Sequence, residues 1–204
     1  MDEDSPADGG VVIGQDGIAR CAWCTGSADY VAYHDQEWGR PVRGDTAIFE
    51  RICLEAFQSG LSWLTILRKR PAFRTAFAQF DPRVVAQFNS SDVDRLMDDA
   101  GIVRNRRKVE ATIGNARAVV SMLDESGSSA LDALFWSFAP SPLQKRPKSI
   151  TEVASATDDS RALSARLKEI GLSWVGPTTM YAAMQACGVV NDHLIGCAAP
   201  GEWA

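Results

Sequence analysis

The chain contains two histidines, and each is paired along the sequence with a cysteine: Cys21 with His34, and His193 with Cys197. His193 and Cys197 are four residues apart, so on a helical turn their side chains point the same way. Two thiolates and two imidazoles hold Zn²⁺ in a closed tetrahedron that leaves no position for water. The set predicts one structural zinc ion that joins the two ends of the chain. The alternative is scattered core thiols and surface imidazoles.

A further cysteine, Cys24, leaves a second assignment open, because Cys21-x-x-Cys24 would supply both thiolates. A zinc deaminase also uses His, Glu and a Cys-x-x-Cys pair, but there the order is H-x-E followed by P-C-x-x-C. Here the cysteine pair precedes His34 and no proline leads it, which excludes that class of enzyme.

Glu55 is a carboxylate on the apolar face of a predicted helix that begins near Asp45. It lies seven residues after Ile48 and three after Ile52, so it shares their buried face. A buried carboxylate must find a partner, or desolvation raises its pKa. Aromatic residues crowd the flanking segments: Trp23, Tyr30, Tyr33 and Trp38 upstream, and Trp63 downstream after a break at Gly60. These surroundings suit a cationic or electron-poor aromatic ligand. The alternative is that Glu55 pairs with a core arginine while the tryptophans fill space.

The string Gly171-Leu-Ser-Trp-Val-Gly-Pro177 predicts a turn between two helices, one ended by glycine and the next begun by proline. Glycines let a ligand approach the backbone closely. The free N–H groups in the first turn of a helix carry a partial positive charge that suits a phosphate. This is the form of a helix-hairpin-helix DNA-binding element, and an ordinary αα-hairpin is the alternative.

In the rest of the sequence, the residues that typically begin and end helices recur at intervals that predict further helices. Asp81-Pro82 has the order of N-cap and proline that begins a helix, and Thr157 or Asp158 opens a helix that Gly171 ends. There is no sustained period-two alternation and no repeat. We therefore predict an all-α fold, with residues 139–149 as an exposed loop.

Length and charge narrow the class of protein. Residues 1–19 are rich in Gly and Asp and aperiodic, which predicts a disordered tail before a single domain at 20–204. There is no apolar run of the roughly 20 residues that cross a bilayer, and the start does not resemble a signal peptide. We expect a cytoplasmic protein without a membrane partner. The net charge of −5 argues against indiscriminate nucleic-acid binding, but basic clusters at 68–70, 104–108 and 145–148 allow a local basic face.

Several short strings share their order and spacing with one known family. They are Arg20-Cys-x-Trp23, Ala32-Tyr-His-Asp-x-Glu-Trp-Gly39, Ile52-Cys-Leu-Glu55, Gly60-Leu-Ser-Trp63, Ile113-Gly-Asn-Ala116, Phe135-Trp-Ser-Phe138, Met184-Gln-Ala-Cys-Gly188 and Val190-Asn-Asp-His193. From about Arg20 to Cys197 the chain resembles the DNA-3-methyladenine glycosylase I family, within the helix-hairpin-helix superfamily. The resemblance implies two helical lobes around a base-binding cleft, a substrate of double-stranded alkylated DNA, and no organic cofactor.

The resemblance also implies roles for single residues. The family's zinc ligands fall on Cys21, His34, His193 and Cys197, which leaves Cys24 a spectator. Its base pocket corresponds to Glu55 and Tyr33 as hydrogen-bonding partners, Trp63 as the stacking ring, and Trp23 and Trp38 as walls. Leu61, beside Gly60, matches the loop that enters the space left by a flipped base. The DNA contacts of the hairpin fall on Gly171, Gly176 and Thr178.

The implied reaction asks little of the protein beyond binding. 3-Methyladenine in DNA is cationic, so the enzyme flips the nucleotide and binds the departing purine better than the attached one, and water attacks the oxocarbenium-like sugar. The helix that begins at Pro177 carries no lysine in its first turn for a Schiff base, so we expect no lyase step. Asn191 stands where related glycosylases have an aspartate, and we expect Asp192 only to orient His193. Glu55 and Tyr33 are then predicted to stabilise the leaving base, with free 3-methyladenine as a product.

Two other functions fit part of the pattern. A catalytically silent zinc module that binds DNA or a free purine would keep the zinc and hairpin residues but would not need Glu55 and Trp63. A broader glycosylase that also removes 7-methylguanine or oxidised bases would keep all of them. We expect a monomer with a strong preference for 3-methyladenine.

Overall fold

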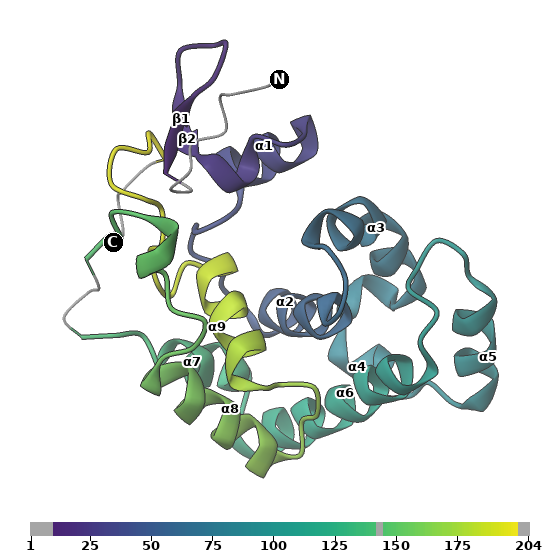
Figure 1. Cartoon of the computed structure of the whole chain (residues 1–204). Helices are drawn as coiled ribbons and strands as arrows, with labels where there is room; N and C mark the ends of the chain where they lie inside the picture. Colours follow the sequence, from purple (N-terminus) through teal and green to yellow (C-terminus); the bar gives the residue numbers. More distant parts are fainter. Residues whose placement is uncertain (1–9, 142–144, 200–204) are drawn as a thin grey trace.

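A computed structural model of the chain describes residues 10–141 and 145–199, and this part is mostly helical (Figure 1). The α-helices are α1 (Ala28–Gln36), α2 (Asp45–Gln58), α3 (Trp63–Ala76), α4 (Pro82–Val85), α5 (Ser90–Asp98), α6 (Arg106–Ser126), α7 (Ala130–Trp136), α8 (Asp158–Ile170) and α9 (Pro177–Ala186). Short 3₁₀ helices span Ala22–Cys24, Ala78–Phe80 and Ile150–Glu152. Within these residues, no helix combines the length and the apolar character that a membrane span requires.

Two short strands, β1 (Val11–Ile13) and β2 (Ala19–Cys21), form an antiparallel hairpin beside α1 at one end of the molecule (Figure 1). The predictions of an all-α fold and of disorder up to residue 19 are therefore wrong for this segment, and residues 1–9 of the predicted tail lie outside the described residues. The β-branched run in β1 favours a strand, and Gly17, at a φ of +76°, permits the tight turn. The hairpin matters for the site because Cys21 ends β2.

The helix α2 lies at the centre and contacts α3, α6, α7 and α9 (Figure 1). Every residue from Arg51 to Phe57 is buried, so this helix has no solvent-facing side over that stretch. Asp45 is the first residue of α2 and not its cap. Its carboxylate instead accepts N–H bonds from Ser129 (2.7 Å) and Asp132 (3.0 Å) at the beginning of α7. The acid thus fastens one helix start to another.

Other predicted helix boundaries are confirmed. Asp81 accepts a bond from the N–H of Arg83 and caps α4, and Thr157 caps α8 through the N–H of Ser160. Gly171 ends α8 at a φ of +105°, the left-handed backbone that glycine adopts without strain. α8 and α9 then pack against each other across the turn 171–176, which places the start of α9 at the surface next to the cavity described below.

Candidate functional site

The four cysteine and histidine residues predicted to bind a metal form one buried cluster. Their ligand atoms all lie within 4.8 Å of one another. Cys21 comes from β2 and His34 from α1, whereas His193 and Cys197 lie in the segment after α9. Cys24 is buried as well but lies outside this set of four. The cluster therefore joins the N-terminal hairpin to the C-terminal segment, as the sequence predicted.

The distances among the ligand atoms of His34, His193 and Cys197 are close to those around a tetrahedral ion, and Cys21 Sγ lies somewhat farther out. His34 Nε2 and His193 Nδ1 are 3.2 Å apart, and Cys197 Sγ lies 3.4 Å from the first and 3.8 Å from the second. Cys21 Sγ is 4.0 Å from His193 Nδ1. Zinc bonded at about 2.3 Å to sulfur and about 2.0 Å to nitrogen would separate two nitrogens by about 3.3 Å, and a nitrogen from a sulfur by about 3.5 Å. The four residues fit such an ion.

The outer nitrogen of each imidazole has a hydrogen-bond acceptor. His34 Nδ1 lies 2.8 Å from Asp35 Oδ1, and His193 Nε2 lies 3.2 Å from the carbonyl oxygen of Trp38. With a proton on each outer nitrogen, the other nitrogen faces the cluster as a lone pair. The acceptor at the outer nitrogen of His193 is therefore the carbonyl oxygen of Trp38, a role that was expected of Asp192.

Arg146, which is not one of the four cluster residues, binds the backbone of the segment that carries His193 and Cys197. Its guanidinium donates to the carbonyl oxygens of His193 (2.9 Å), Leu194 (2.6 Å) and Cys197 (2.9 Å). Arg146 is half-buried and Pro147 is buried, so the prediction of an exposed loop over 139–149 is wrong at these two residues. A basic residue in a proline-rich string gives no periodic signal, which is why the sequence did not reveal this role.

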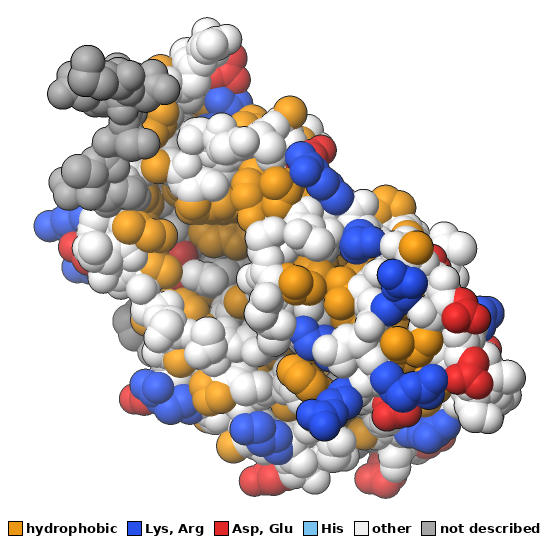
Figure 2. Space-filling model, turned by 45° about the vertical axis from the view of Figure 1, so that its right-hand side comes forward, with side chains coloured by type: hydrophobic (Ala, Val, Ile, Leu, Met, Phe, Trp, Pro, Cys, Tyr) orange, Lys and Arg blue, Asp and Glu red, His pale blue; other side chains and the backbone are white. Residues whose placement is uncertain are grey.

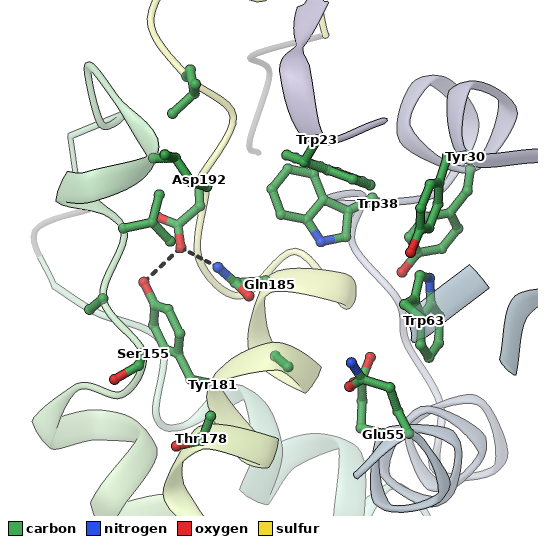
Figure 3. Close-up of a pocket in the computed structure, with 17 residues that line it drawn as sticks. Trp23, Tyr30, Trp38, Glu55, Trp63, Ser155, Thr178, Tyr181, Gln185 and Asp192 are labelled. Carbon is green, nitrogen blue, oxygen red and sulfur yellow. Dashed lines mark hydrogen bonds between the residues drawn. The ribbon is translucent and has the colours of Figure 1, made fainter. Parts of the chain in front are cut away.

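A cavity of about 350 Å³ lies between α2, α9 and the N-terminal segment (Figure 3). All five residues predicted to bind a base line it: Trp23, Tyr33, Trp38, Glu55 and Trp63. The opposite wall carries Thr178, Tyr181 and Gln185 of α9, together with Asp192. The volume is within the range of small-molecule sites, about 300–1,000 Å³. Residues from both ends and the middle of the chain thus meet around one cavity.

Glu55 is 4% exposed, and Figure 3 shows its carboxylate directed into the cavity below Trp63. Burial raises the pKa of Glu55 to about 8, while the charge of Arg51 acts in the opposite direction. No ion pair joins Glu55 to another residue in the described part of the chain. The structure therefore does not contain the alternative arrangement, in which Glu55 forms an ion pair with a core arginine. The carboxylate faces space that a ligand would fill.

Arg51, one helical turn before Glu55 on α2, belongs to an ionic group behind the cavity. Its Nη2 donates to Glu37 Oε2 at 3.1 Å, and Arg70 bonds both carboxylate oxygens of Glu37 at 2.6 and 2.7 Å. The guanidinium carbon lies 5.9 Å from the centroid of the Tyr33 ring. Arg51 Nη1 is buried without a hydrogen-bond partner among the described residues. Sequence reasoning missed this group because its members come from three separate segments.

The aromatic walls of the cavity contact one another in two groups. The rings of Tyr33 and Trp63 are 5.4 Å apart and tilted by 48°. Trp23 lies edge-on to Trp38 at 4.9 Å and to Tyr30 at 5.7 Å. Tyr30 also lines the cavity, and its hydroxyl accepts the N–H of Leu64 at 3.0 Å near the start of α3. These contacts hold flat apolar surfaces in place before a ligand arrives.

Asp192 is a second buried acid of the cavity, on the wall opposite Glu55 (Figure 3). Its Oδ2 accepts bonds from the Tyr181 hydroxyl and from Gln185 Nε2, both at 2.7 Å. The side-chain oxygen of Asn191 accepts the backbone N–H of His193 at 3.1 Å. The side-chain oxygen of Asn191 is therefore used within its own segment.

Two exposed segments adjoin the mouth of the cavity. In the loop between α2 and α3, Gln58 and Trp63 line the cavity, while Leu61 between them is 41% exposed. Gly60 takes a φ of +84° in this loop. In the first turn of α9, Thr178 is exposed and also lines the cavity. Of the residues predicted to contact DNA, Thr178 thus lines the cavity, and Leu61 lies in a loop between two residues that line it.

The chain matches the model of the methyladenine glycosylase family over residues 23–200. It is 47% identical over 181 residues to DNA-3-methyladenine glycosylase 1 of Escherichia coli K12, across 88% of this chain and 96% of that relative. A crystal structure of 3-methyladenine DNA glycosylase I superposes with a TM-score of 0.83 at 44% identity, across 88% of this chain and 98% of the other. A tyrosine-to-phenylalanine variant of such an enzyme, in complex with 3-methyladenine, gives a TM-score of 0.84 at 33% identity, across 91% and 99%.

Proposed function

Because the chain belongs to the methyladenine glycosylase family, we propose that it is a monofunctional DNA glycosylase specific for 3-methyladenine. It hydrolyses the N-glycosidic bond of this base in alkylated double-stranded DNA and releases the free base from an abasic site. The observation that carries the proposal is Glu55, a buried carboxylate that faces an aromatic cavity without an ion pair in the described chain. A relative with 3-methyladenine bound supports the choice of ligand.

In this proposal the cavity recognises the base by charge, stacking and hydrogen bonds. Glu55 accepts hydrogen bonds from the purine edge and favours a cationic ring. Tyr33 fixes the orientation of the base and Trp63 stacks on it, while Trp23 and Trp38 exclude water. A neutral adenine gains less from the carboxylate than an alkylated one does, which gives the preference for the damaged base.

The residues stabilise the departing base more than the attached one. As the bond between the purine and C1′ breaks, its electron pair goes to the purine and the sugar becomes oxocarbenium-like. Water then adds to C1′ and loses a proton to solvent. The first turn of α9 has no lysine for a Schiff base, so the product is an abasic site with an intact strand.

The Cys/His cluster is proposed to hold one structural zinc ion, bound by Cys21, His34, His193 and Cys197. Closed tetrahedral zinc supplies folding energy and no reaction chemistry. Its support is the convergence of four buried donor atoms within 4.8 Å of one another, together with acceptors on both outer imidazole nitrogens. The ion would hold Trp38, whose carbonyl contacts His193, in the wall of the base cavity.

DNA is proposed to bind as a helix-hairpin-helix protein binds it. A phosphate would accept hydrogen bonds from the backbone N–H groups in the first turn of α9. The N-cap residue of this helix, Gly176, has no side chain that could accept these bonds instead. A Cβ on Gly176 would meet only Thr179 Oγ1, at 4.0 Å, so a ligand can approach this backbone closely. Gly171 and Thr178 flank the contact, and Leu61 enters the space left by the flipped base. We further propose that the protein acts as a monomer in the cytoplasm.

An excision assay on duplex DNA with a single 3-methyladenine tests the proposal. Release of the free base well above the spontaneous rate, without strand cleavage until alkali is added, is expected. Base release at only the spontaneous rate would favour the silent zinc module. Competition with 7-methylguanine and oxidised bases addresses the broader glycosylase, and equal rates for these lesions would contradict the proposed specificity.

A further inference from the structure

The turn between α8 and α9 presents an exposed tryptophan on a strained backbone. Trp174 is 40% exposed, and its φ of +60° lies in the left-handed region that aromatic residues rarely adopt. It does not line the base cavity. Glycine would occupy this position without strain, so burial and backbone preference do not explain why a large indole stands here.

Bonds on both sides of Trp174 hold the strained conformation. The amide of Asn115 accepts the N–H of Ser173 at 2.8 Å and donates to the carbonyl oxygen of Ser173 at 3.0 Å. On the other side, Ser164 Oγ donates to the carbonyl oxygen of Val175 at 2.6 Å. The neighbours of Trp174 are thus fixed by α6 and α8, and the indole is displayed in one place.

Lys108 connects this tryptophan to the loop that carries Leu61. The ammonium lies 5.2 Å from the centroid of the Trp174 ring. The same Nζ donates to the carbonyl oxygens of Phe57 (2.8 Å) and Ser59 (2.6 Å) at the end of α2, where a cation is favoured by the helix dipole. The indole and the loop at the cavity mouth therefore share one buried cation.

The surroundings of Lys108 suit an anionic polymer. Arg104 and Arg107 are exposed, and neither has an ion-pair partner among the described residues, in contrast to Arg106, which pairs with Asp94 and Glu110. Figure 2 shows Lys and Arg side chains spread over the lower and right-hand part of one face, beside a hollow lined by hydrophobic side chains. Exposed arginines without an ion-pair partner in the described part of the chain, and an exposed indole, are both typical of surfaces that contact nucleic acid.

We propose that Trp174 is a DNA-contacting residue that packs against the damaged strand next to the flipped nucleotide. Trp174 from the hairpin and Leu61 from the loop are then two exposed apolar contacts, and Lys108 joins the segments that carry them. The indole covers a base or deoxyribose face that flipping leaves without its neighbour. This inference rests on the proposed function, because it requires DNA at the hairpin.

The test is binding to a duplex with one tetrahydrofuran abasic-site analogue, measured by fluorescence anisotropy. Trp174→Ala is expected to weaken this binding by about tenfold, the scale of one lost stacking contact. Trp174→Phe keeps a flat ring and should recover most of the affinity. Binding of free 3-methyladenine should stay unchanged in both variants, which shows that the base cavity is intact.

Two matched variants separate contact from folding and from charge. Trp174→Gly relieves the positive φ and should keep the thermal midpoint within a few degrees while it loses DNA affinity like the alanine variant. Arg107→Ala should reduce the salt dependence of DNA binding by about one phosphate contact, whereas Trp174→Ala should leave that slope unchanged. An affinity of Trp174→Ala within twofold of the wild type would overturn the inference. Absence of excision by the wild type would instead overturn the proposed function.

Discussion

The Cys/His cluster and the base cavity share a wall. The ring of Trp38 lies 4.6 Å from that of His193 on one side and lines the cavity on the other. Both regions bury ionisable groups. In the cluster, the four donor atoms face one another and both outer imidazole nitrogens have acceptors. In the cavity, Glu55 is buried to the same degree but faces open space.

The difference distinguishes a group that serves the fold from one that serves binding. Four donors that converge on one ion leave no coordination position for a substrate. The free energy of metal binding therefore stabilises the folded chain. A desolvated carboxylate that faces a cavity costs stability until a ligand supplies its hydrogen bonds. Substitutions in the two regions should therefore change stability in opposite directions.

The largest effect is expected from Cys197→Ala. We expect this variant to lose the roughly one zinc per chain that the wild type holds, because three ligands bind the ion far less tightly than four. The free energy of unfolding should fall by at least about 3 kcal/mol, since the two ends of the chain are no longer joined. Elemental analysis and urea unfolding with and without a chelator measure both quantities.

Cys24→Ala is the matched control, because Cys24 is buried nearby but is not one of the four donors. It should keep the metal. Loss of zinc in Cys24→Ala but not in Cys197→Ala would overturn the ligand assignment. Equal unfolding of the wild type with and without chelator would show that the cluster holds no structural ion.

Glu55→Gln should have the opposite consequence for stability. The substitution keeps the shape of the side chain and removes an acidic group that is buried without an ion pair in the described chain. We expect binding of free 3-methyladenine to weaken by about a hundredfold, as charge-assisted hydrogen bonds are lost. The free energy of unfolding should stay the same or rise. NMR titration and urea unfolding of the same sample measure the two effects.

A variant that is destabilised by about 2 kcal/mol or more, with unchanged binding of the base, would show that Glu55 is structural. Thr112→Val is a suitable control for a buried polar substitution away from the cavity. Thr112 is buried on α6, and its hydroxyl bonds a backbone carbonyl within that helix. It should lose some stability and no affinity for the base.

The residue types and their spacing suggested both regions, and the resemblance to the glycosylase family assigned the residues within them. Two histidines, each with a cysteine, leave few combinations, and Glu55 interrupts an apolar helical face at a definite period. The N-terminal hairpin was not predicted, since three-residue strands are too short for alternation to be visible. The bonds of Arg146 and of the Glu37, Arg51 and Arg70 group were not predicted either, because they join separate segments.

The smallest and most specific effect concerns pH. The pKa of Glu55 is raised to about 8 in the folded chain, from 4.5 when exposed, so the folded state binds an extra proton between these values. This contribution to stability is present below pH 4.5 and is lost as the pH rises through about 8. Base binding needs the deprotonated carboxylate of the folded chain, so affinity should rise as the pH increases through about 8. Glu55→Gln should lack both dependences.

Arg51→Met sharpens this prediction, since Arg51 is the charge that lowers the pKa of Glu55. The other groups nearby are Tyr33, Glu37 and Arg70 from the α1 and α3 side, and Tyr181, Cys187 and Asp192 from the α9 side. Removal of the Arg51 charge should move the midpoint of base binding upward by about one pH unit. Arg70→Met, which loses only the bonds to Glu37, should leave the midpoint in place. Equal shifts in the two variants would mean that Arg51 acts through Glu37 and not on Glu55 directly.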